Sequence, residues 1–143
     1  MLGLLALLSA ALFTGAAVYI NVAEQPARLE LDNEGALAEW APSYKRGFAM
    51  QATLAVLSGL LGLIAWWSSR EPIWAVGAIL MLANWPYTLL VIRPTNQRLE
   101  STPPGQTSSE TRRLLLRWGR LHAVRSGLGL LATATFLFAA RPA

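Results

Sequence analysis

One histidine and one arginine interrupt a long apolar stretch near the C-terminus. Trp118, His122 and Arg125 follow one another at spacings of four and three residues, which places them in one stripe along a helix. Histidine has an ordinary pKa close enough to neutrality to act as an acid or as a base. An arginine inside a membrane is costly unless it faces the helix bundle and has a partner. Glu24 is the one acid at comparable depth, so the pattern predicts a buried Glu24–Arg125 ion pair beside His122.

Both basic residues also have an ordinary structural interpretation. Arg125 can extend toward the lipid headgroups and anchor the end of its helix, and His122 can be a hydrogen-bonded structural residue. A functional interpretation is favoured because other segments bring polar and aromatic side chains to the same level, as pockets that orient a ligand do. The candidates for binding a substrate are Gln25, Arg28, Tyr44, Gln51, Trp85, Tyr87, Thr88, Asn96 and Trp118.

Metal chemistry fits this sequence poorly. The chain has one histidine and no cysteine, so an iron or copper site would need Glu24 together with amide ligands, an unusual set for those metals. The lack of cysteine also excludes disulfides and thiolate nucleophiles. The sequence therefore predicts a site without a metal. A haem held by one histidine, or another bound ligand, stays open as an alternative, although no attachment motif is present.

The composition indicates where such a site would lie. Of the 143 residues, 54% are hydrophobic and 14% are charged, a bias that soluble domains do not show. Four apolar stretches of about 20 residues each match the thickness of a bilayer, and lipid leaves the helix as their one sensible conformation. We expect an all-α fold, a four-helix transmembrane bundle with a polar layer near its cytoplasmic end. It forms a single domain, residues 1–143, with helices over 2–22, 47–68, 72–92 and 108–140 and loops over 23–46 and 93–107.

Basic residues gather on one side of the predicted membrane. The loops 23–46 and 93–120 share that side and contain Arg28, Lys45, Arg46, Arg93, Arg98, Arg112, Arg113, Arg117 and Arg120, whereas the other side has only Arg70 and Arg141. The positive-inside rule places these loops in the cytoplasm and both termini outside, in a plasma or inner membrane. Attraction to anionic headgroups accounts for the net charge of +4 without a nucleic-acid partner.

Small residues four positions apart predict close contacts between helices, because they let two backbones approach. These pairs are Ala11 with Gly15, Ser58 with Gly62 and Gly129 with Thr133. The third pair equally suits contact with a second copy of the chain, so a homo-oligomer stays open.

Prolines and caps predict where helices start and bend. Pro42 suits the first turn of the second helix, and Pro86 should kink the third helix near Trp85. Thr107 and Glu110 have the spacing of a capping box, which would begin the fourth helix before the bilayer.

Several of these landmarks occur in an order that resembles a known family. They are Glu24-Gln25-Pro26-Ala27-Arg28, Trp40 with Tyr44, Gln51, Trp85-Pro86-Tyr87-Thr88, Arg93-Pro94-Thr95-Asn96, and Trp118 with His122 and Arg125. Over nearly the whole chain they resemble the anthrone oxygenase-like family. The resemblance implies a four-helix membrane protein whose fungal relatives oxidise anthrones to anthraquinones without a dedicated redox cofactor.

The implied chemistry suits the predicted residues. An anthrone that loses a ring CH₂ proton becomes an electron-rich anion that reacts with O₂ directly, so the protein needs a base, donors to the developing oxyanion and a dry, flat pocket. His122, alone or with Glu24, would be the base, and Arg125 and Tyr44 would stabilise the anion. The residues that would stack on the substrate rings are Trp85, Tyr87 and Trp118.

One residue departs from the family pattern, which has a histidine where this chain has Gln25. If that histidine is the base in the relatives, this chain uses another base or acts on another substrate. Two other functions fit the same residues: a carrier or binder of a quinone-like molecule, and a structural or accessory membrane subunit. The expected partners are the lipid bilayer, a lipophilic small molecule and O₂.

Overall fold

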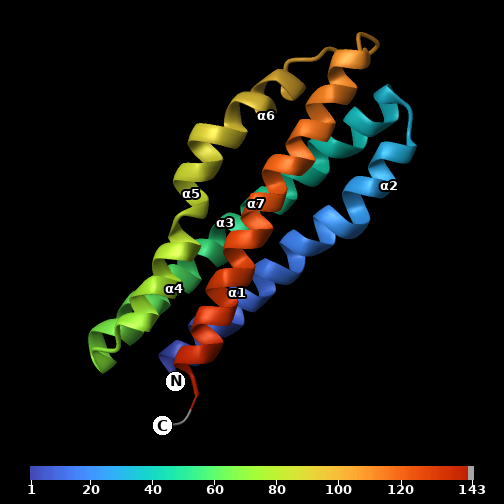
Figure 1. Ribbon diagram of the computed structural model, residues 1–143. Coiled ribbons are helices and arrows are strands. Elements are labelled where there is room, and N and C mark those ends of the chain that lie inside the picture. The colour runs from blue at the N-terminus through green and yellow to red at the C-terminus, as the bar shows by residue number, and fades with distance from the viewer. Residues whose placement is uncertain (142–143) are drawn as a thin grey trace.

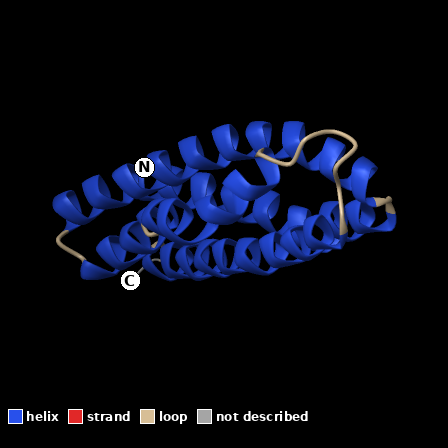
Figure 2. Ribbon diagram, turned by 90° about the horizontal axis from the view of Figure 1, so that it is seen from above, coloured by secondary structure: helices blue, strands red, loops and turns tan. Residues whose placement is uncertain are grey.

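The computed structural model describes residues 1–141, and within that range the chain forms helices and no strand (Figure 1). Four helical segments are long and apolar enough to cross a membrane: Leu2–Glu30, Asn33–Ser69, Pro72–Glu100 and Ser109–Ala139. They lie side by side along one axis, joined by short connections at the two ends (Figure 2). The predicted all-α, four-helix fold is confirmed, and the chain is an integral membrane protein.

The predicted loop 23–46 is wrong, because almost all of it is helical. The first segment runs without a break through α1 (Leu2–Tyr19), the π-helical turn η1 (Ile20–Glu24) and α2 (Gln25–Glu30). Only Leu31 and Asp32 separate it from α3 (Asn33–Ser69). The Asp32 side chain caps α3 by accepting a hydrogen bond from the Gly35 N–H at 2.7 Å. Leu37 and Trp40 then bury one face of the added turns, so the residues expected in a loop extend the bundle.

The third segment is also longer than predicted and is interrupted once. It consists of α4 (Pro72–Leu82), α5 (Asn84–Tyr87), the π-helical turn η2 (Thr88–Ile92) and α6 (Arg93–Glu100). The predicted loop 93–107 is therefore helical up to Glu100. The interruption falls at Ala83, just before the predicted kink near Trp85. There the Asn84 side chain donates to the Met81 carbonyl at 3.1 Å and satisfies a backbone group beside the break.

Two predicted helix starts are shifted. The fourth helix, α7 (Ser109–Ala139), has a capping box formed by Ser108 and Thr111. The predicted capping box of Thr107 and Glu110 is therefore displaced by one residue. Pro42 lies inside α3 rather than in its first turn, because Asp32 starts that helix earlier in the chain.

The bundle has two different ends (Figure 1). At the terminal end lie the N-terminus, the last described residues and the α3–α4 turn; at the loop end lie the α2–α3 turn and the α6–α7 loop. The core of the terminal half consists of Ala6, Ala10, Phe13, Ala17, Ala55, Ala65, Trp74, Ala78, Met81, Ala132 and Phe136. The core of the loop half consists of Ala36, Leu37, Trp40, Ile92, Leu99, Leu114, Leu115 and Trp118. Most of the predicted site residues lie between these two cores or beside the second one.

Two of the three predicted small-residue pairs join helices. Ser58 is fully buried and donates to the Ala6 carbonyl at 2.8 Å, so α3 packs closely on α1. Thr133 on α7 hydrogen-bonds Thr14 on α1 at 2.9 Å. Gly129, one turn earlier, backs directly onto Thr14 as well. This pair is therefore used inside one chain.

The third pair, Ala11 with Gly15, is not a contact between helices. Both residues are exposed, and no atom of another helix comes near the position where a Gly15 side chain would lie. The prediction was wrong because spacing alone does not say which face of a helix is turned inward.

Candidate functional site

Six of the predicted site residues line one small pocket between the first segment, α3 and α7. They are Glu24, Tyr44, Gln51, Trp118, His122 and Arg125, joined by Ile20, Ser43, Gly47 and Phe48. The free volume is about 20 Å³, little more than one water molecule occupies. The structure thus brings together all three predicted catalytic residues, but in a space far too small for an aromatic ring system.

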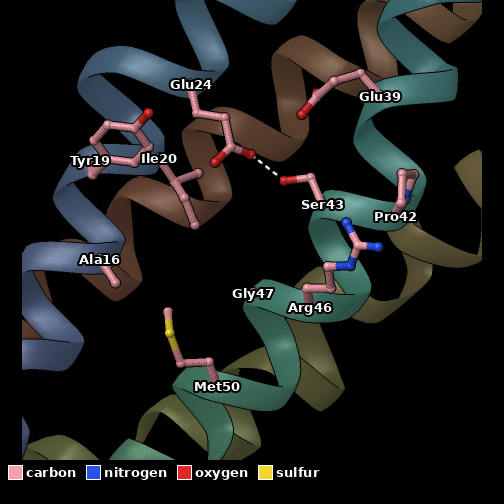
Figure 3. Close-up of a pocket in the computed structure, with 10 residues that line it drawn as sticks. All are labelled: Ala16, Tyr19, Ile20, Glu24, Glu39, Pro42, Ser43, Arg46, Gly47 and Met50. Atoms are coloured by element: carbon pink, nitrogen blue, oxygen red, sulfur yellow. Dashed lines mark hydrogen bonds between the residues drawn. The ribbon is translucent and has the colours of Figure 1, made fainter.

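A much larger groove adjoins the pocket on the side of α1 and α3. It has a volume of about 570 Å³ and is lined by Ala16, Tyr19, Ile20, Glu24, Glu39, Pro42, Ser43, Arg46, Gly47 and Met50 (Figure 3). This size is within the range of small-molecule sites, roughly 300–1,000 Å³. Tyr19 and Met50 are exposed at its rim, so a lipophilic ligand can reach it from the side of the bundle. Glu24 is the one predicted site residue that lines both cavities.

Glu24 does not pair with Arg125, as the sequence suggested. It accepts hydrogen bonds from Arg28, one turn further along its own segment, and from Ser43 on α3, and Figure 3 shows Glu24 and Ser43 facing each other across the groove. Arg28 also pairs with Glu39 and donates to the Gln25 side chain at 2.5 Å. Because Arg28 stands at the i+4 position, it meets the Glu24 carboxylate before any residue of α7 can.

The Arg28 network holds the loop half together. The Arg28 side chain is 1% exposed and lies over the Trp118 ring, 5.5 Å from its centroid, a cation–π geometry. Gln25 donates from Nε2 to the Leu115 carbonyl at 2.8 Å. Gln25 and Arg28 line neither the pocket nor the groove. Their role in this structure is to join α2, α3 and α7 behind Glu24.

Arg125 is a buried cation without a partner among the described residues. It is 5% exposed, forms no ion pair within residues 1–141, has a buried Nε without a hydrogen-bond partner, and lies over the Phe13 ring, 5.5 Å from its centroid. The snorkelling alternative does not describe this side chain, because it is buried in the bundle. A buried charge normally requires a compensating group, so the guanidinium is available for an anionic ligand.

Arg125 also borders a second small cavity between α3 and the third segment. This cavity has a free volume of about 10 Å³ and is lined by Phe48, Ala52, Ala55, Asn84, Trp85, Thr88, Leu89 and Arg125. Trp85 and Thr88, predicted to bind substrate, are thus separated from the groove by Phe48 and Arg125. Tyr87 donates its hydroxyl to the Leu121 carbonyl at 3.0 Å and joins α5 to α7. Asn96 is buried without lining any of these three cavities.

Asn21 orients the histidine, and sequence reasoning missed it. Its Nδ2 donates to the Gly119 carbonyl at 2.9 Å, which can only accept, so Oδ1 is the atom turned toward α7. That oxygen receives the Ser126 hydroxyl at 2.7 Å and lies 2.9 Å from His122 Nδ1. Nδ1 therefore carries a proton, and Nε2 is the ring nitrogen without a hydrogen-bond partner among the described residues, on the ring that lines the pocket. The available signal was that Asn21 is the one amide in the first apolar stretch.

Two π-helical turns lie beside this layer. In η1 the Gln25 N–H bonds to the Ile20 carbonyl, and in η2 the Arg93 N–H bonds to the Thr88 carbonyl, each across five residues. The residue that follows each of these donors is a proline, Pro26 or Pro94, which has no N–H to continue the regular ladder. Such wide turns are rare and often occur at functional sites. Here η1 carries Glu24 to the groove and the pocket and Asn21 to His122.

Aromatic rings continue around the pocket on the side of α3 and α7. Trp118 stacks on His122 with a centroid separation of 5.0 Å, and Trp40 stacks on Tyr44 at 5.0 Å. Trp40 also meets Trp118 edge to face at 6.1 Å. Trp118 is therefore already stacked within the protein, and one of its faces is not free for a substrate ring. Within residues 1–141, no three histidine, aspartate or glutamate side chains gather as a metal site would require.

The fold and the site define a class of protein: a four-helix membrane protein with a carboxylate, a histidine and an unpaired arginine around a small pocket beside a ligand-sized groove. The anthrone oxygenase family model matches residues 40–135. The chain is 30% identical over 131 residues to anthrone oxygenase tpcL of Aspergillus fumigatus, covering 85% of this chain and 81% of that relative. The chain belongs to the anthrone oxygenase family. No solved structure matches it.

Proposed function

We propose that this protein is a membrane-embedded oxygenase that oxidises an activated CH₂ group of a lipophilic, anthrone-like aromatic without a dedicated cofactor. Membership of the anthrone oxygenase family supports the reaction class. The observation that carries the proposal is the position of Glu24, on the wall shared by the large groove and the small pocket that contains the unpaired Arg125. A base thus lies beside the volume that fits the aromatic, with a cation directly behind it.

The order of the steps follows from these positions. The aromatic lies in the groove, and a carboxylate oxygen of Glu24 takes one proton from its CH₂ group, breaking the C–H bond. The resulting anion is electron-rich and reacts with O₂. Negative charge that develops toward the pocket is stabilised by Arg125, which needs no rearrangement because no protein acceptor holds it. Overall, R₂CH₂ and O₂ give R₂C=O and H₂O, so no external reductant is required.

Glu24 and His122 are the two candidates for the base that removes the substrate proton. Glu24 lines the groove, whereas His122 lines only the pocket behind it. We therefore assign removal of the substrate proton to Glu24. The free Nε2 of His122 serves the later proton transfers at the oxygen atoms in the pocket.

The direct test measures O₂ consumption and carbonyl product with a simple anthrone and the purified protein in nanodiscs, against the spontaneous background. We expect wild type to exceed the background and Glu24→Gln to lose at least about a hundredfold in the excess rate. Lys45→Gln, which changes a charge on the neighbouring helix α3 outside the described cavities, is the control and should retain the rate. Wild type equal to the background across a panel of anthrones would exclude this substrate class.

A second function, binding or transport of a quinone-like molecule, uses the same groove. It is favoured by the exposed rim at Tyr19 and Met50, which opens the groove toward the surroundings of the bundle. This alternative predicts saturable binding of a quinone with no O₂ uptake, and equal affinity in wild type and Glu24→Gln.

We also propose that the loop end faces the cytoplasm and both termini face outward, in a plasma or inner membrane, because basic residues concentrate at the loop end. The chain has no cysteine, so a maleimide can label a single-cysteine variant only at the introduced residue. A membrane-impermeant maleimide should label Ser69→Cys in intact cells and Gln106→Cys only after permeabilisation. The reverse pattern would invert the orientation.

A further inference from the structure

Three N–H groups around the small pocket have no acceptor among the described residues. They belong to Gln51 Nε2 on α3 and to Trp118 Nε1 and Arg125 Nε on α7, and all three atoms are buried. Buried polar groups in proteins are almost always hydrogen-bonded, and each unsatisfied one costs about 1–3 kcal/mol. Three donors around one space, one of them on a cation, form a site for an electron-rich atom that the protein itself does not supply.

The size of the pocket restricts what that atom belongs to. The free volume is about 20 Å³, and one water molecule needs about 10–15 Å³ on this scale. A molecule of two or three atoms fits, and a ring does not. The adjoining groove, at about 570 Å³, takes the larger ligand. Both cavities share Ile20, Glu24, Ser43 and Gly47, so the two molecules would lie next to each other at these residues.

Two side chains that line the same pocket have partners elsewhere, whereas Gln51 Oε1 is buried without a partner, like the three donors. The Glu24 carboxylate at the wall is already held by Arg28 and Ser43. His122 is held at Nδ1 by Asn21. The unpaired donors and the Arg125 charge therefore act on whatever small molecule enters.

From this geometry we propose that the small pocket binds dioxygen and the superoxide formed from it. This inference rests on the proposed function. The substrate anion in the groove transfers one electron to O₂, which gives a substrate radical and superoxide. The two recombine to form a C–O bond, and the peroxide R₂CH–OO⁻ takes up the proton that Glu24 removed, relayed through Nε2 of His122. Removal of the second C–H proton with cleavage of the O–O bond gives R₂C=O and water.

The donors favour the reduced form selectively. Neutral O₂ is a poor acceptor of hydrogen bonds, whereas superoxide carries a full charge that Gln51, Trp118 and Arg125 can stabilise. The charge forms only after electron transfer, so these groups stabilise superoxide more than bound O₂. They therefore accelerate the electron transfer.

The first test compares two tryptophans that differ in one respect. Trp118 and Trp40 both have a buried indole N–H without a partner, but only Trp118 lines the pocket. We expect Trp118→Phe and Gln51→Met to lower kcat/KM for O₂ by about tenfold to a hundredfold, with KM for the aromatic changed less than about twofold. Trp40→Phe, which removes the same group elsewhere, should leave the O₂ dependence unchanged. Equal effects of the two tryptophan substitutions, or a change confined to KM for the aromatic, would overturn the proposal.

The second test does not depend on turnover. Azide is a small linear anion whose infrared stretch reports its surroundings, and it stands here for superoxide. Wild type should bind azide, with the affinity reduced at least about tenfold in Arg125→Gln and Trp118→Phe but not in Trp40→Phe. Azide should also compete with O₂ and not with the aromatic.

The two tests separate this inference from the proposed function. Wild type that oxidises no aromatic yet binds azide in the expected variant pattern would refute the oxygenase proposal and retain the pocket as a site for a small oxygen anion. Wild type that turns over while azide fails to bind or to compete with O₂ would refute the pocket alone. Circular dichroism confirms that each variant keeps its helices.

Discussion

The two halves of the bundle satisfy their polar groups differently. In the terminal half, Ser58 donates to the Ala6 carbonyl and Thr14 pairs with Thr133. From the central layer toward the loop end, by contrast, buried polar side-chain atoms without a partner occur in Trp40, Gln51, Asn84, Asn96, Trp118 and Arg125. The terminal half thus gains stability from close packing of small residues, whereas the other half leaves buried donors open.

This difference separates residues that hold the bundle together from residues that are available to a ligand. Unpaired buried groups lower the free energy of unfolding, and such costs concentrate at functional sites. The loop half offsets part of the cost with the Arg28 network and with stacked aromatic rings. Four pairs of substitutions test this division, the first three in order of decreasing expected effect on stability.

The largest loss is expected for Arg28→Met. It leaves the carboxylates of Glu24 and Glu39 without their shared cation, and these carboxylates are 23% and 40% exposed, so the loss should lie between that of a surface pair, about 1 kcal/mol, and that of a fully buried one, about 3–5 kcal/mol. Arg113→Met is the matched control, because Arg113 is 71% exposed and pairs only with Glu110 on its own helix; its loss should be under about 1 kcal/mol. Unfolding in mixed detergent micelles measures both, and equal losses would contradict a stabilising network in the loop half.

A smaller loss is expected for Gly129→Ala in the terminal half. The new Cβ would lie 2.7 Å from Thr14 Oγ1 and 2.9 Å from the Phe13 ring, and such crowding costs about 1–3 kcal/mol. Gly127, on the same helix, has no neighbouring atom within 4 Å of its Cβ position. Gly127→Ala should therefore stabilise by about 0.5–1 kcal/mol. If both substitutions shift thermal unfolding in the same direction, α1 and α7 do not pack as described.

Effects of opposite sign are expected at Ser58 and Gln51, both on α3. Ser58→Ala removes a satisfied hydrogen bond and should lower the free energy of unfolding by about 1 kcal/mol. Gln51→Met replaces an amide with two unpaired atoms by an apolar chain of similar length and should raise it by about the same amount. Only Gln51→Met should slow oxidation. Destabilisation by Gln51→Met would indicate that the protein itself satisfies this amide.

The fourth pair concerns the histidine, and its readout is spectroscopic. His122 is the one histidine in the chain, so ¹⁵N labelling of histidine gives one pair of ring signals. Wild type should show a protonated Nδ1 and an unprotonated Nε2, because Asn21 Oδ1 accepts from Nδ1. Asn21→Leu should mix the two tautomers, while Ser9→Ala, on the same helix but far from the ring, should not. A proton on Nε2 in wild type would show that Asn21 does not set the tautomer.

The sequence by itself determined the class of fold and most of the residues at the site level. Apolar length and composition are local properties, and in lipid they leave only the helix, so the four segments followed without reference to tertiary contacts. The stripe Trp118, His122 and Arg125 was equally predictable, because helical spacing fixes which side chains share a face. The landmarks that resemble the family were readable for the same reason.

Tertiary structure decided which polar groups meet. Whether Glu24 pairs with Arg125 or with Arg28 depends on how far each side chain reaches and on how η1 turns. The depth of a residue in the membrane, which can be read from the sequence, determines neither. The roles of Asn21 and Ser43, the exposure of Gly15 and the helical state of residues 33–46 depended likewise on neighbours distant in the chain. Local hydropathy determines which segments of the chain form helices. The energy of an ion pair or hydrogen bond instead depends on distances of a few ångströms, which only the packed bundle sets.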